Sequence, residues 1–305
     1  MRAPIAVLGT GGIGGLLAAG TGAICVGTER SVAAIRDRGL ALTQGGATVV
    51  ARLEAVERLD RPVSLLVVAV KAYDLDAALE RIPPATLGGA VVLPLLNGLE
   101  HVDALRRRLS ERDTVSLVAP PAVAAGSIGR VEAVSPEPGV VVQRMPAAAV
   151  IEAASRDLDG QALADVLAPL RVSGIDVVVG DDEGAVLWSK VARLAVLAAA
   201  TVASGATVGE LRGDDRWRPR LEAALRETCA VATADGVALE AATQWAIIQA
   251  MPADLTTSAA RDAAAGRPTE LDAIAGSVVR AARRHEMQTP VLDEVLAEAG
   301  ARRAA

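Results

Sequence analysis

The stretch that decides the fold lies near the amino terminus and reads Ile5-Ala6-Val7-Leu8-Gly9-Thr10-Gly11-Gly12-Ile13-Gly14. Four apolar residues indicate a buried strand, and the glycines after them form a G-x-G-x-x-G pattern. The first glycine permits a tight turn, the second lets the backbone approach a pyrophosphate, and the third lets a helix pack closely on the strand. The partly positive N-terminus of that helix then faces the phosphates. The pattern predicts a dinucleotide site formed by Gly9, Thr10, Gly11, Gly12, Ile13 and Gly14.

A second apolar strand, 23–26, supports this prediction and leads to the residues that select the cofactor. Glu29 stands about where an acid would hydrogen-bond the ribose 2′-hydroxyl of NAD. Thr28 and Arg30 could instead hold the 2′-phosphate of NADP. From these residues alone, both interpretations stay open.

Two more apolar strands, 64–70 and 90–96, each end just before a residue type that is rare in this chain. Lys71 follows the first and is one of only two lysines, with Lys190, while Asn97 follows the second and is the only asparagine. This depletion is typical of a GC-rich genome, in which arginine replaces lysine wherever a generic charge suffices. A lysine ammonium can lose its proton when desolvated, so the surviving lysines are candidates for a chemical role. Ligands bind at the carboxyl ends of such strands, which favours a site near Lys71 and Asn97.

The character of the chain changes near residue 180. Strand-like runs near Val115, at 140–142 and at 176–179 precede an acidic linker at 180–184. Helical patterns then dominate, over 188–208, 216–236, around Trp245 and in a last long helix over 270–284, with an N-cap at 256–258. The sequence therefore predicts an α/β protein with a Rossmann-type dinucleotide-binding domain over 1–180, followed by an all-α domain over 181–305.

Composition argues against several other classes of protein. An apolar content of 51% with 22% charged residues is typical of a globular chain, and a net charge of -6 disfavours nucleic acid and anionic membranes as partners. The uncharged run 194–209 is shorter than the ~18 to 20 residues of a membrane span. Cys25 and Cys229 are expected to be reduced, buried thiols of a cytoplasmic protein. His101 and His285 do not show metal-ligand spacing to another histidine or a cysteine, so we expect no metal site. We expect both histidines to be solvated residues in loops or at helix ends.

Five motifs in their order and spacing make the chain resemble the ketopantoate reductase family. They are Gly9 to Gly15, Val70-Lys71-Ala72-Tyr73-Asp74, Asn97-Gly98, Trp188-Ser189-Lys190 and Thr269-Glu270-Leu271-Asp272. The resemblance spans nearly the whole chain. It implies an NADPH-dependent reductase of 2-dehydropantoate in pantothenate synthesis, with a Rossmann domain, a helical domain and an active site in the cleft between them.

The resemblance also implies roles for single residues. Lys190 resembles the catalytic lysine that donates a proton, and Glu270 resembles its acidic partner, although an acid at a helix N-terminus also has a purely structural interpretation. Ser258, twelve residues before Glu270, matches a substrate-binding serine. Asn97 and Lys71 match polar residues at the nicotinamide side, with Asn97 also facing the substrate.

Arg30 matches the arginine that holds the 2′-phosphate in that family. The resemblance thus favours NADPH as the cofactor and a small 2-oxo acid as the substrate. It leaves a homodimer open as the assembly.

The chain departs from the family at three places. The family usually carries asparagines four and eight residues after the catalytic lysine, where this chain has Leu194 and Ala198, and its Thr-His pair is replaced by Ala119-Pro120. Positions 190, 194 and 198 share one helix face, which predicts an apolar wall beside Lys190. Because the remaining motifs all match the family, ketopantoate is the predicted substrate. The apolar wall favours the alternative, a different 2-oxo acid or related ketone with an apolar side chain. A non-catalytic NADP(H) sensor is less favoured, because it would need only the first domain.

Overall fold

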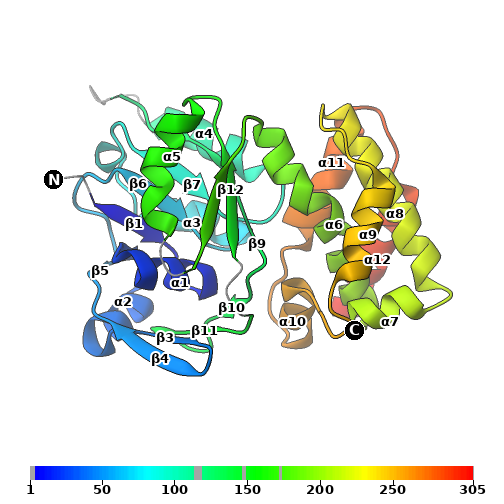
Figure 1. Cartoon of the computed structure of the whole chain (residues 1–305), viewed down its shortest axis with the longest axis horizontal. Coiled ribbons are helices and arrows are strands. Elements are labelled where there is room, and N and C mark those ends of the chain that lie inside the picture. Colours follow the sequence, from blue (N-terminus) through cyan, green and yellow to red (C-terminus); the bar gives the residue numbers. More distant parts are fainter. Residues whose placement is uncertain (1–3, 113–118, 146–148, 172–173, 305) are drawn as a thin grey trace. The chain divides into compact units, whose positions relative to one another are not determined.

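Figure 1 shows the computed structural model of the chain, in which residues 4–112, 119–145, 149–171 and 174–304 are described. The chain forms two compact units. The first comprises Met1–Leu96 and His101–Val186, and the second comprises Asn97–Glu100 and Leu187–Ala305. The sequence places the boundary after residue 180, whereas the structure places it after Val186 and assigns the short segment Asn97–Glu100 to the second unit.

The first unit contains a six-stranded sheet in the order β5-β2-β1-β6-β7-β8, and its strands pair in parallel. These strands are β1 (Ile5–Leu8), β2 (Ile24–Val26), β5 (Ala55–Val56), β6 (Leu65–Val68), β7 (Val91–Pro94) and β8 (Ala122–Val123). The central strands β6 and β7 are buried along their whole length, as their continuous apolar runs predicted. The Rossmann-type fold and the four predicted strands of this sheet are thereby confirmed, with each strand end within two residues of its predicted position.

The helices α1 (Gly12–Thr21), α2 (Glu29–Arg38), α3 (Leu75–Leu79) and α4 (His101–Arg112) connect the parallel strands. Helix α1 contacts β1 and also β11 (Val140–Gln143), a strand of a second sheet. Two adjacent glycines make this possible. A Cβ on Gly14 would lie 1.8 Å from the carbonyl oxygen of Gly9, and one on Gly15 would lie 2.5 Å from the Val141 side chain.

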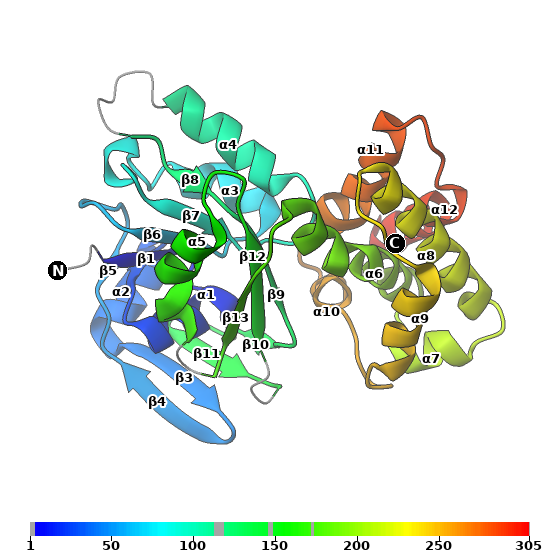
Figure 2. The ribbon, with the colours of Figure 1, turned by 45° about the horizontal axis from the view of Figure 1, so that its top comes forward.

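Two smaller sheets complete the first unit. One has the order β10-β11-β3-β4 and the other the order β13-β12-β9. Their strands are β3 (Leu40–Gln44), β4 (Ala47–Ala51), β9 (Ala125–Gly129), β10 (Ala133–Val134), β11 (Val140–Gln143), β12 (Val150–Ala154) and β13 (Asp176–Val179), with helix α5 at Gly160–Leu167. The strands predicted at 140–142 and 176–179 are confirmed, and Val115 lies outside the described residues. The β3–β4 hairpin, which projects from the unit in Figure 2, was not predicted, because β4 is almost wholly exposed and has no apolar alternation.

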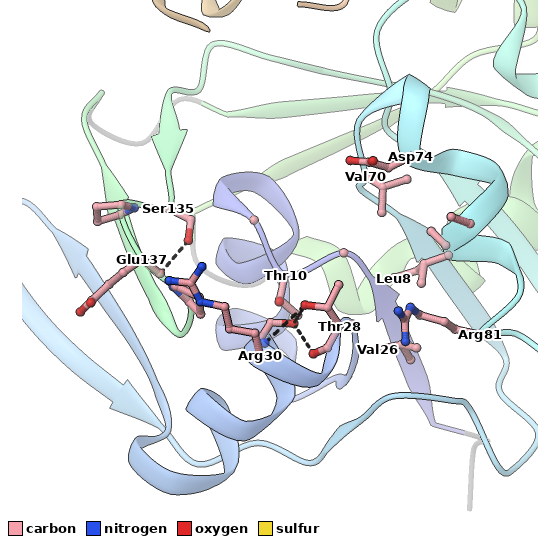
Figure 3. A pocket seen from close by; sticks show the side chains of 18 residues that line it. Leu8, Thr10, Val26, Thr28, Arg30, Val70, Asp74, Arg81, Ser135 and Glu137 are labelled. Atoms are coloured by element: carbon pink, nitrogen blue, oxygen red, sulfur yellow. Dashed lines mark hydrogen bonds between the residues drawn. The ribbon is translucent and has the colours of Figure 1, made fainter. Parts of the chain in front are cut away.

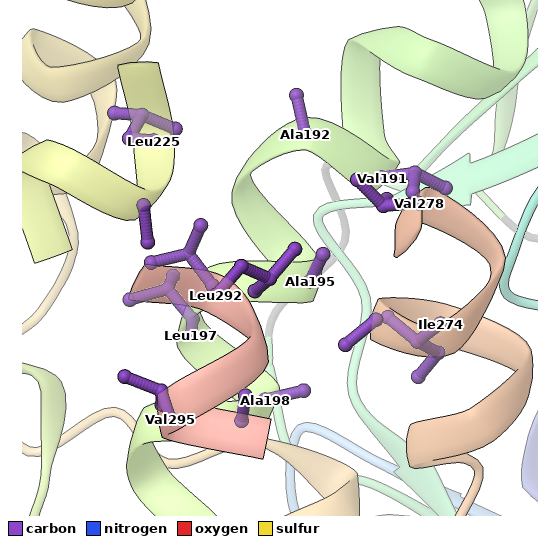
Figure 4. Packing of buried hydrophobic residues seen from close by; sticks show 14 of the residues in the cluster. Val191, Ala192, Ala195, Leu197, Ala198, Leu225, Ile274, Val278, Leu292 and Val295 are labelled. Atoms are coloured by element: carbon purple, nitrogen blue, oxygen red, sulfur yellow. The ribbon is translucent and has the colours of Figure 1, made fainter. Parts of the chain in front are cut away.

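The second unit consists of helices packed around one apolar core. They are α6 (Glu183–Ser204), α7 (Val208–Gly213), α8 (Trp217–Ala234), α9 (Ala241–Ala250), α10 (Ser258–Ala264), α11 (Ser277–Arg284) and α12 (Pro290–Ala304). Alanines of α6 meet valine and leucine side chains of α8, α11 and α12 in this core (Figure 4). Helix α6 is the one helix of the described chain that is long and apolar enough to cross a membrane, but 72% of its most apolar window is buried in the protein. An apolar helix that is mostly buried in this way is typical of the core helix of a helical domain.

Three predictions about this half need correction. The acidic linker is shorter than expected, because α6 already begins at Glu183. The predicted helix 270–284 is interrupted by a π-helical turn, Asp272–Gly276. It is also not the last helix, since Pro290 opens α12, where a proline at the first helical position gives up no hydrogen bond.

Candidate functional site

A pocket of about 520 Å³ lies in the first unit at the carboxyl ends of β1 and β2 (Figure 3). Its wall includes the glycine loop, the start of α2, one side of α3 and the segment 135–138. The lining residues are Leu8, Gly9, Thr10, Gly11, Val26, Gly27, Thr28, Arg30, Ser31, Val70, Asp74, Ala77, Ala78, Arg81, Ser135, Pro136, Glu137 and Pro138.

The glycine loop has the shape that a dinucleotide requires. Gly9 has a φ of +94°, which favours glycine, and the carbonyl of Gly9 leaves no room for a Cβ on Gly14. A Cβ on Gly12 would lie 2.0 Å from the carbonyl oxygen of Ala133, whereas one on Gly11 would meet nothing within 4 Å. The loop is therefore closed against the protein on two sides and open at the glycine where phosphates approach the backbone. The residues present fit a bound pyrophosphate at the start of α1.

The residues after β2 form one side of this pocket. The Thr28 hydroxyl caps α2 by accepting a hydrogen bond from the Ser31 backbone amide at 3.4 Å. Arg30 is exposed, lines the pocket and extends toward Ser135 and Glu137 in Figure 3. Glu29 is not among the lining residues.

Most of the lining residues were not predicted from the sequence, and Ser31 and Arg81 are two polar examples. Ser31 could have been found from the cap that it forms with Thr28 three residues earlier. Arg81 carries no local signal, because it reaches the pocket from beyond α3 while its guanidinium donates to the Glu57 carbonyl at 3.2 Å.

Not all predicted cofactor residues line the pocket. Gly12, Ile13 and Gly14 lie in the first turn of α1, directly after the lining residue Gly11. Lys71 follows β6, is half-buried and stands at the start of a short 3₁₀ turn, outside the lining. Asn97 belongs to the second unit.

The second unit brings three predicted site residues into one hydrogen-bonded chain. The Lys190 ammonium donates to Asn97 Oδ1 at 2.9 Å, and Asn97 Nδ2 donates to Glu270 Oε2 at 3.4 Å. Lys190 lies on α6, and Glu270 is buried at 5% exposure just before the π-helical turn. A carboxylate only accepts hydrogen bonds, so Glu270 turns the Asn97 amide with its nitrogen toward the acid and its oxygen toward the lysine.

Local backbone geometry explains how Asn97 arrives there. Gly98 has a φ of +106°, and a Cβ on it would lie 2.0 Å from the Ala273 carbonyl oxygen. The chain can therefore approach the π-helical turn closely only because this residue is glycine. Such π-helical turns are frequent at functional sites.

Ser258 is the first residue of α10 and is half-buried. The preceding Thr257 is the N-cap, as the sequence predicted for 256–258, and its hydroxyl accepts from the Ala260 amide at 3.2 Å. The same hydroxyl lies 2.8 Å from that of the buried Thr201 on α6. The start of α10 is thus attached to the helix that carries Lys190.

The two residues of the predicted apolar wall, Leu194 and Ala198, differ in their burial. Leu194 is half-buried and packs against the helical core. Ala198 is fully buried within that core, near Val295 in Figure 4. Ala198 therefore packs the helix, and only Leu194 keeps exposed surface on this face.

The two histidines and two cysteines belong neither to the pocket lining nor to the hydrogen-bonded residues Lys190, Asn97 and Glu270. His101 is buried at 6% exposure, so its predicted solvation was wrong: it begins α4, whose next residue, Val102, is also buried. His285 caps the exposed end of α11, and its Nε2 lies 2.5 Å from Asp235 Oδ1. Cys25 and Cys229 are free and buried, and desolvation raises their thiol pKa values to about 12 and about 11. Within the described ranges, no group of three or more His, Cys, Asp or Glu side chains could hold a metal.

Comparison with known proteins agrees with this geometry. The family model "Ketopantoate reductase PanE/ApbA" matches residues 5–156, and "Ketopantoate reductase PanE/ApbA C terminal" matches residues 184–303. A 2-dehydropantoate 2-reductase from Halobacterium salinarum is 30% identical over 290 residues, which cover 92% of this chain and 91% of the relative.

Solved structures give the same result. A PanE/ApbA family ketopantoate reductase from Ralstonia eutropha aligns with a TM-score of 0.81 and 27% identity, covering 100% of this chain and 99% of that one. D-mandelate dehydrogenase in a ternary complex with NADH and anilino(oxo)acetate shares the fold, with a TM-score of 0.83, 21% identity and coverage of 100% and 99%. The chain therefore belongs to the ketopantoate reductase PanE/ApbA family and is a 2-dehydropantoate 2-reductase-like oxidoreductase.

Proposed function

We propose that the protein reduces 2-dehydropantoate to pantoate with NADPH, in pantothenate synthesis, and that Lys190 is the general acid. The observation that carries this proposal is the hydrogen-bonded chain from Lys190 through Asn97 to Glu270. Reduction of a ketone by hydride requires a proton donor for the carbonyl oxygen, and here an amide and a carboxylate orient the ammonium that could serve as this donor.

A nicotinamide bound through the glycine-loop pocket would supply the hydride to the carbonyl carbon of the substrate. Negative charge then develops on the carbonyl oxygen, so a donor near this oxygen stabilises the transition state more than the ground state. Lys190 transfers a proton from Nζ to that oxygen. General acids of this kind contribute about 10² to 10⁴ in rate.

Asn97 and Glu270 serve this proton transfer by orientation. The amide oxygen of Asn97 holds one N–H of the ammonium, which fixes the direction of the others. Glu270 prevents the amide from turning over. In the proposal Glu270 and Ser258 also provide polar contacts for the substrate.

NADPH is proposed rather than NADH because of the residues that line the pocket after β2. Thr28, Arg30 and Ser31 line it and Glu29 does not, so hydroxyl and guanidinium donors suited to a 2′-phosphate are present. Arg81 adds a second positive charge to the lining.

A second candidate substrate is favoured by Leu194, which keeps exposed apolar surface one turn after Lys190. A substrate hydroxyl buried against it would lose hydration without a partner, which costs about 1 to 3 kcal/mol. A 2-oxo acid with a branched apolar side chain would avoid that cost.

The test is NADPH oxidation over a panel of 2-oxo acids, comparing kcat/KM for ketopantoate and for its analogue without the hydroxyl. We expect ketopantoate to be preferred. If the analogue is preferred by about tenfold or more, the ketopantoate assignment fails and the apolar 2-oxo acid replaces it. If NADPH binds and neither a 2-oxo acid nor a related ketone is reduced, the proposed reductase fails and the sensor alternative replaces it. The cytoplasmic location and the homodimer stay predictions.

A further inference from the structure

An ion-pair cluster on the second unit, which we call the Arg280 clasp, joins Arg280, Glu100 and Asp272. Arg280 on α11 donates from Nε to both oxygens of Glu100, at 3.0 and 3.1 Å, and from Nη2 to Glu100 Oε2 at 2.8 Å. It also donates from Nη1 to Asp272 Oδ1 at 2.8 Å and from Nη2 to the Asp272 carbonyl at 3.0 Å. One guanidinium thus holds two segments that are distant in the sequence.

The backbone is shaped around this clasp. A Cβ on Gly276 would lie 2.9 Å from Asp272 Oδ1 and 3.1 Å from Arg280 Nη1, so glycine leaves the space in which the two side chains meet. Gly98 makes the close approach to Ala273 in the same turn. The contacted residues Asp272, Ala273 and Gly276 all belong to the π-helical turn Asp272–Gly276.

The hydrogen bonds from Lys190 to Asn97 and from Asn97 to Glu270 form what we call the Lys190 chain. Each segment held by the clasp carries one of its residues. Asn97 precedes Glu100 by three residues, and Glu270 precedes Asp272 by two. We propose that Arg280 is a positioning residue, which holds these two segments together so that Asn97 bridges Lys190 and Glu270. The catalytic meaning of this inference rests on the proposed function.

The exposure of the clasp separates positioning from plain stabilisation. The side chains of Arg280, Glu100 and Asp272 are 37%, 41% and 88% exposed. Single ion pairs this exposed contribute little to the stability of a fold, whereas bidentate and networked pairs contribute more, so Tm is measured beside the positioning readouts. A small displacement of a catalytic group, by contrast, can lower a rate by about 100-fold.

The matched control is the Arg220–Glu298 pair, which joins α8 and α12 in the same unit. It is also bidentate, with distances of 3.2 and 2.8 Å, and its arginine is only 14% exposed. It shares no residue with the Lys190 chain. Arg220 also lies 3.3 Å from Glu294 and 4.5 Å over the Trp217 ring, so Arg220→Gln removes contacts with at least as many residues as the Arg280 variants do, without touching the segments of Asn97 and Glu270.

The chain's two lysines provide a readout that does not depend on the substrate. In wild type, Arg280→Gln, Arg280→Lys and Arg220→Gln, the folded proteins are acetylated with limiting acetic anhydride, and the rates at Lys190 and Lys71 are compared by mass spectrometry. Arg280→Lys keeps the positive charge but loses the planar guanidinium that binds Glu100 through two nitrogens. This variant replaces Arg280→Gln in the comparison if the glutamine variant does not fold. We expect the Lys190/Lys71 rate ratio to rise by about threefold or more in the Arg280 variants, because the ammonium loses its Asn97 acceptor, and to stay unchanged in Arg220→Gln.

Turnover is measured with any 2-oxo acid that the wild type reduces. We expect kcat to fall about tenfold in Arg280→Gln, with KM for NADPH within about twofold and Tm within about 3 °C. In the Asn97→Ala background, Arg280→Gln should lower kcat no further, since its effect passes through Asn97.

An unchanged acetylation ratio, an equal change in Arg220→Gln, or a full additional fall in the Asn97→Ala background would each overturn the inference. If the wild type reduces no 2-oxo acid, the proposed function fails, and the acetylation ratio still decides whether Arg280 holds the Lys190 chain.

Discussion

The pocket of the first unit and the Lys190 chain of the second unit are built in opposite ways. The pocket takes its central feature from the backbone of one continuous loop, in which Gly9, Gly11 and Gly14 have no side chains. The Lys190 chain consists of side-chain atoms from segments 93 and 173 residues apart. A backbone site is damaged by adding a methyl group, whereas a side-chain cluster is damaged by altering the groups that meet in it.

The largest expected effect is at Lys190. Lys190→Arg keeps the charge but replaces a compact donor with a guanidinium that does not release its proton in proteins. Turnover with the preferred 2-oxo acid should fall by at least ~100-fold, while the dissociation constant for NADPH, measured by fluorescence titration, stays within about twofold. Near-normal turnover would remove Lys190 from the chemistry and leave the second unit without its side-chain site.

The glycine loop offers a matched pair of substitutions in the first unit. Gly14→Ala places a Cβ against the Gly9 carbonyl and should lower the free energy of unfolding by about 1 to 3 kcal/mol. Gly11→Ala meets no atom, so the unfolding transition in urea should hardly move while NADPH binding weakens, because the methyl group occupies the open side of the loop. Equal destabilisation by both changes would contradict the distinct roles given to these glycines.

Arg30 tests the cofactor preference within the pocket. Arg30→Ala should raise KM for NADPH by about tenfold and leave KM for NADH nearly unchanged, because only the 2′-phosphate loses a charged donor. Glu29→Ala is the matched control, one residue away and outside the lining. If wild type binds NADH as tightly as NADPH and Glu29→Ala weakens NADH, the NAD interpretation is correct.

The smallest expected effect is the change in stability with pH that comes from the two buried thiols, one in each unit. Both pKa values are raised above the usual 9.0, to about 12 for Cys25 and about 11 for Cys229, so folding keeps both thiols protonated. An acid whose pKa is raised on folding contributes stability below about pH 9 and loses it as pH rises further. The free energy of unfolding should therefore fall between pH 8 and 10, measured in urea.

The variants Cys25→Ala and Cys229→Ala divide that pH effect between the units. The decline between pH 8 and 10 should become shallower by a similar amount in both variants, because both folded pKa values lie above this range and both unfolded thiols start from 9.0. A decline that is unchanged in both variants would show that other groups cause it.

The local sequence determined much of the first unit. Strand β1 begins and ends at the predicted residues, and the spacing of Gly9, Gly11 and Gly14 predicted the turn, the open position and the close packing that the structure contains. Such features follow from periodicity and from the conformational freedom of glycine, which act over a few residues. The resemblance to the family added Lys190, Asn97 and Glu270 as candidates without stating how they meet.

Only the tertiary structure decided how Lys190, Asn97 and Glu270 come into contact. Asn97 follows a strand of the first unit and yet lies in the second, because Gly98 lets the chain approach Ala273 and because Arg280 joins Glu100 to Asp272. The interruption of the predicted helix by Asp272–Gly276 and the burial of Ala198 were also decided at this level. None of these features has a local sequence signal, because each depends on atoms from segments that are remote in the chain and close only after folding.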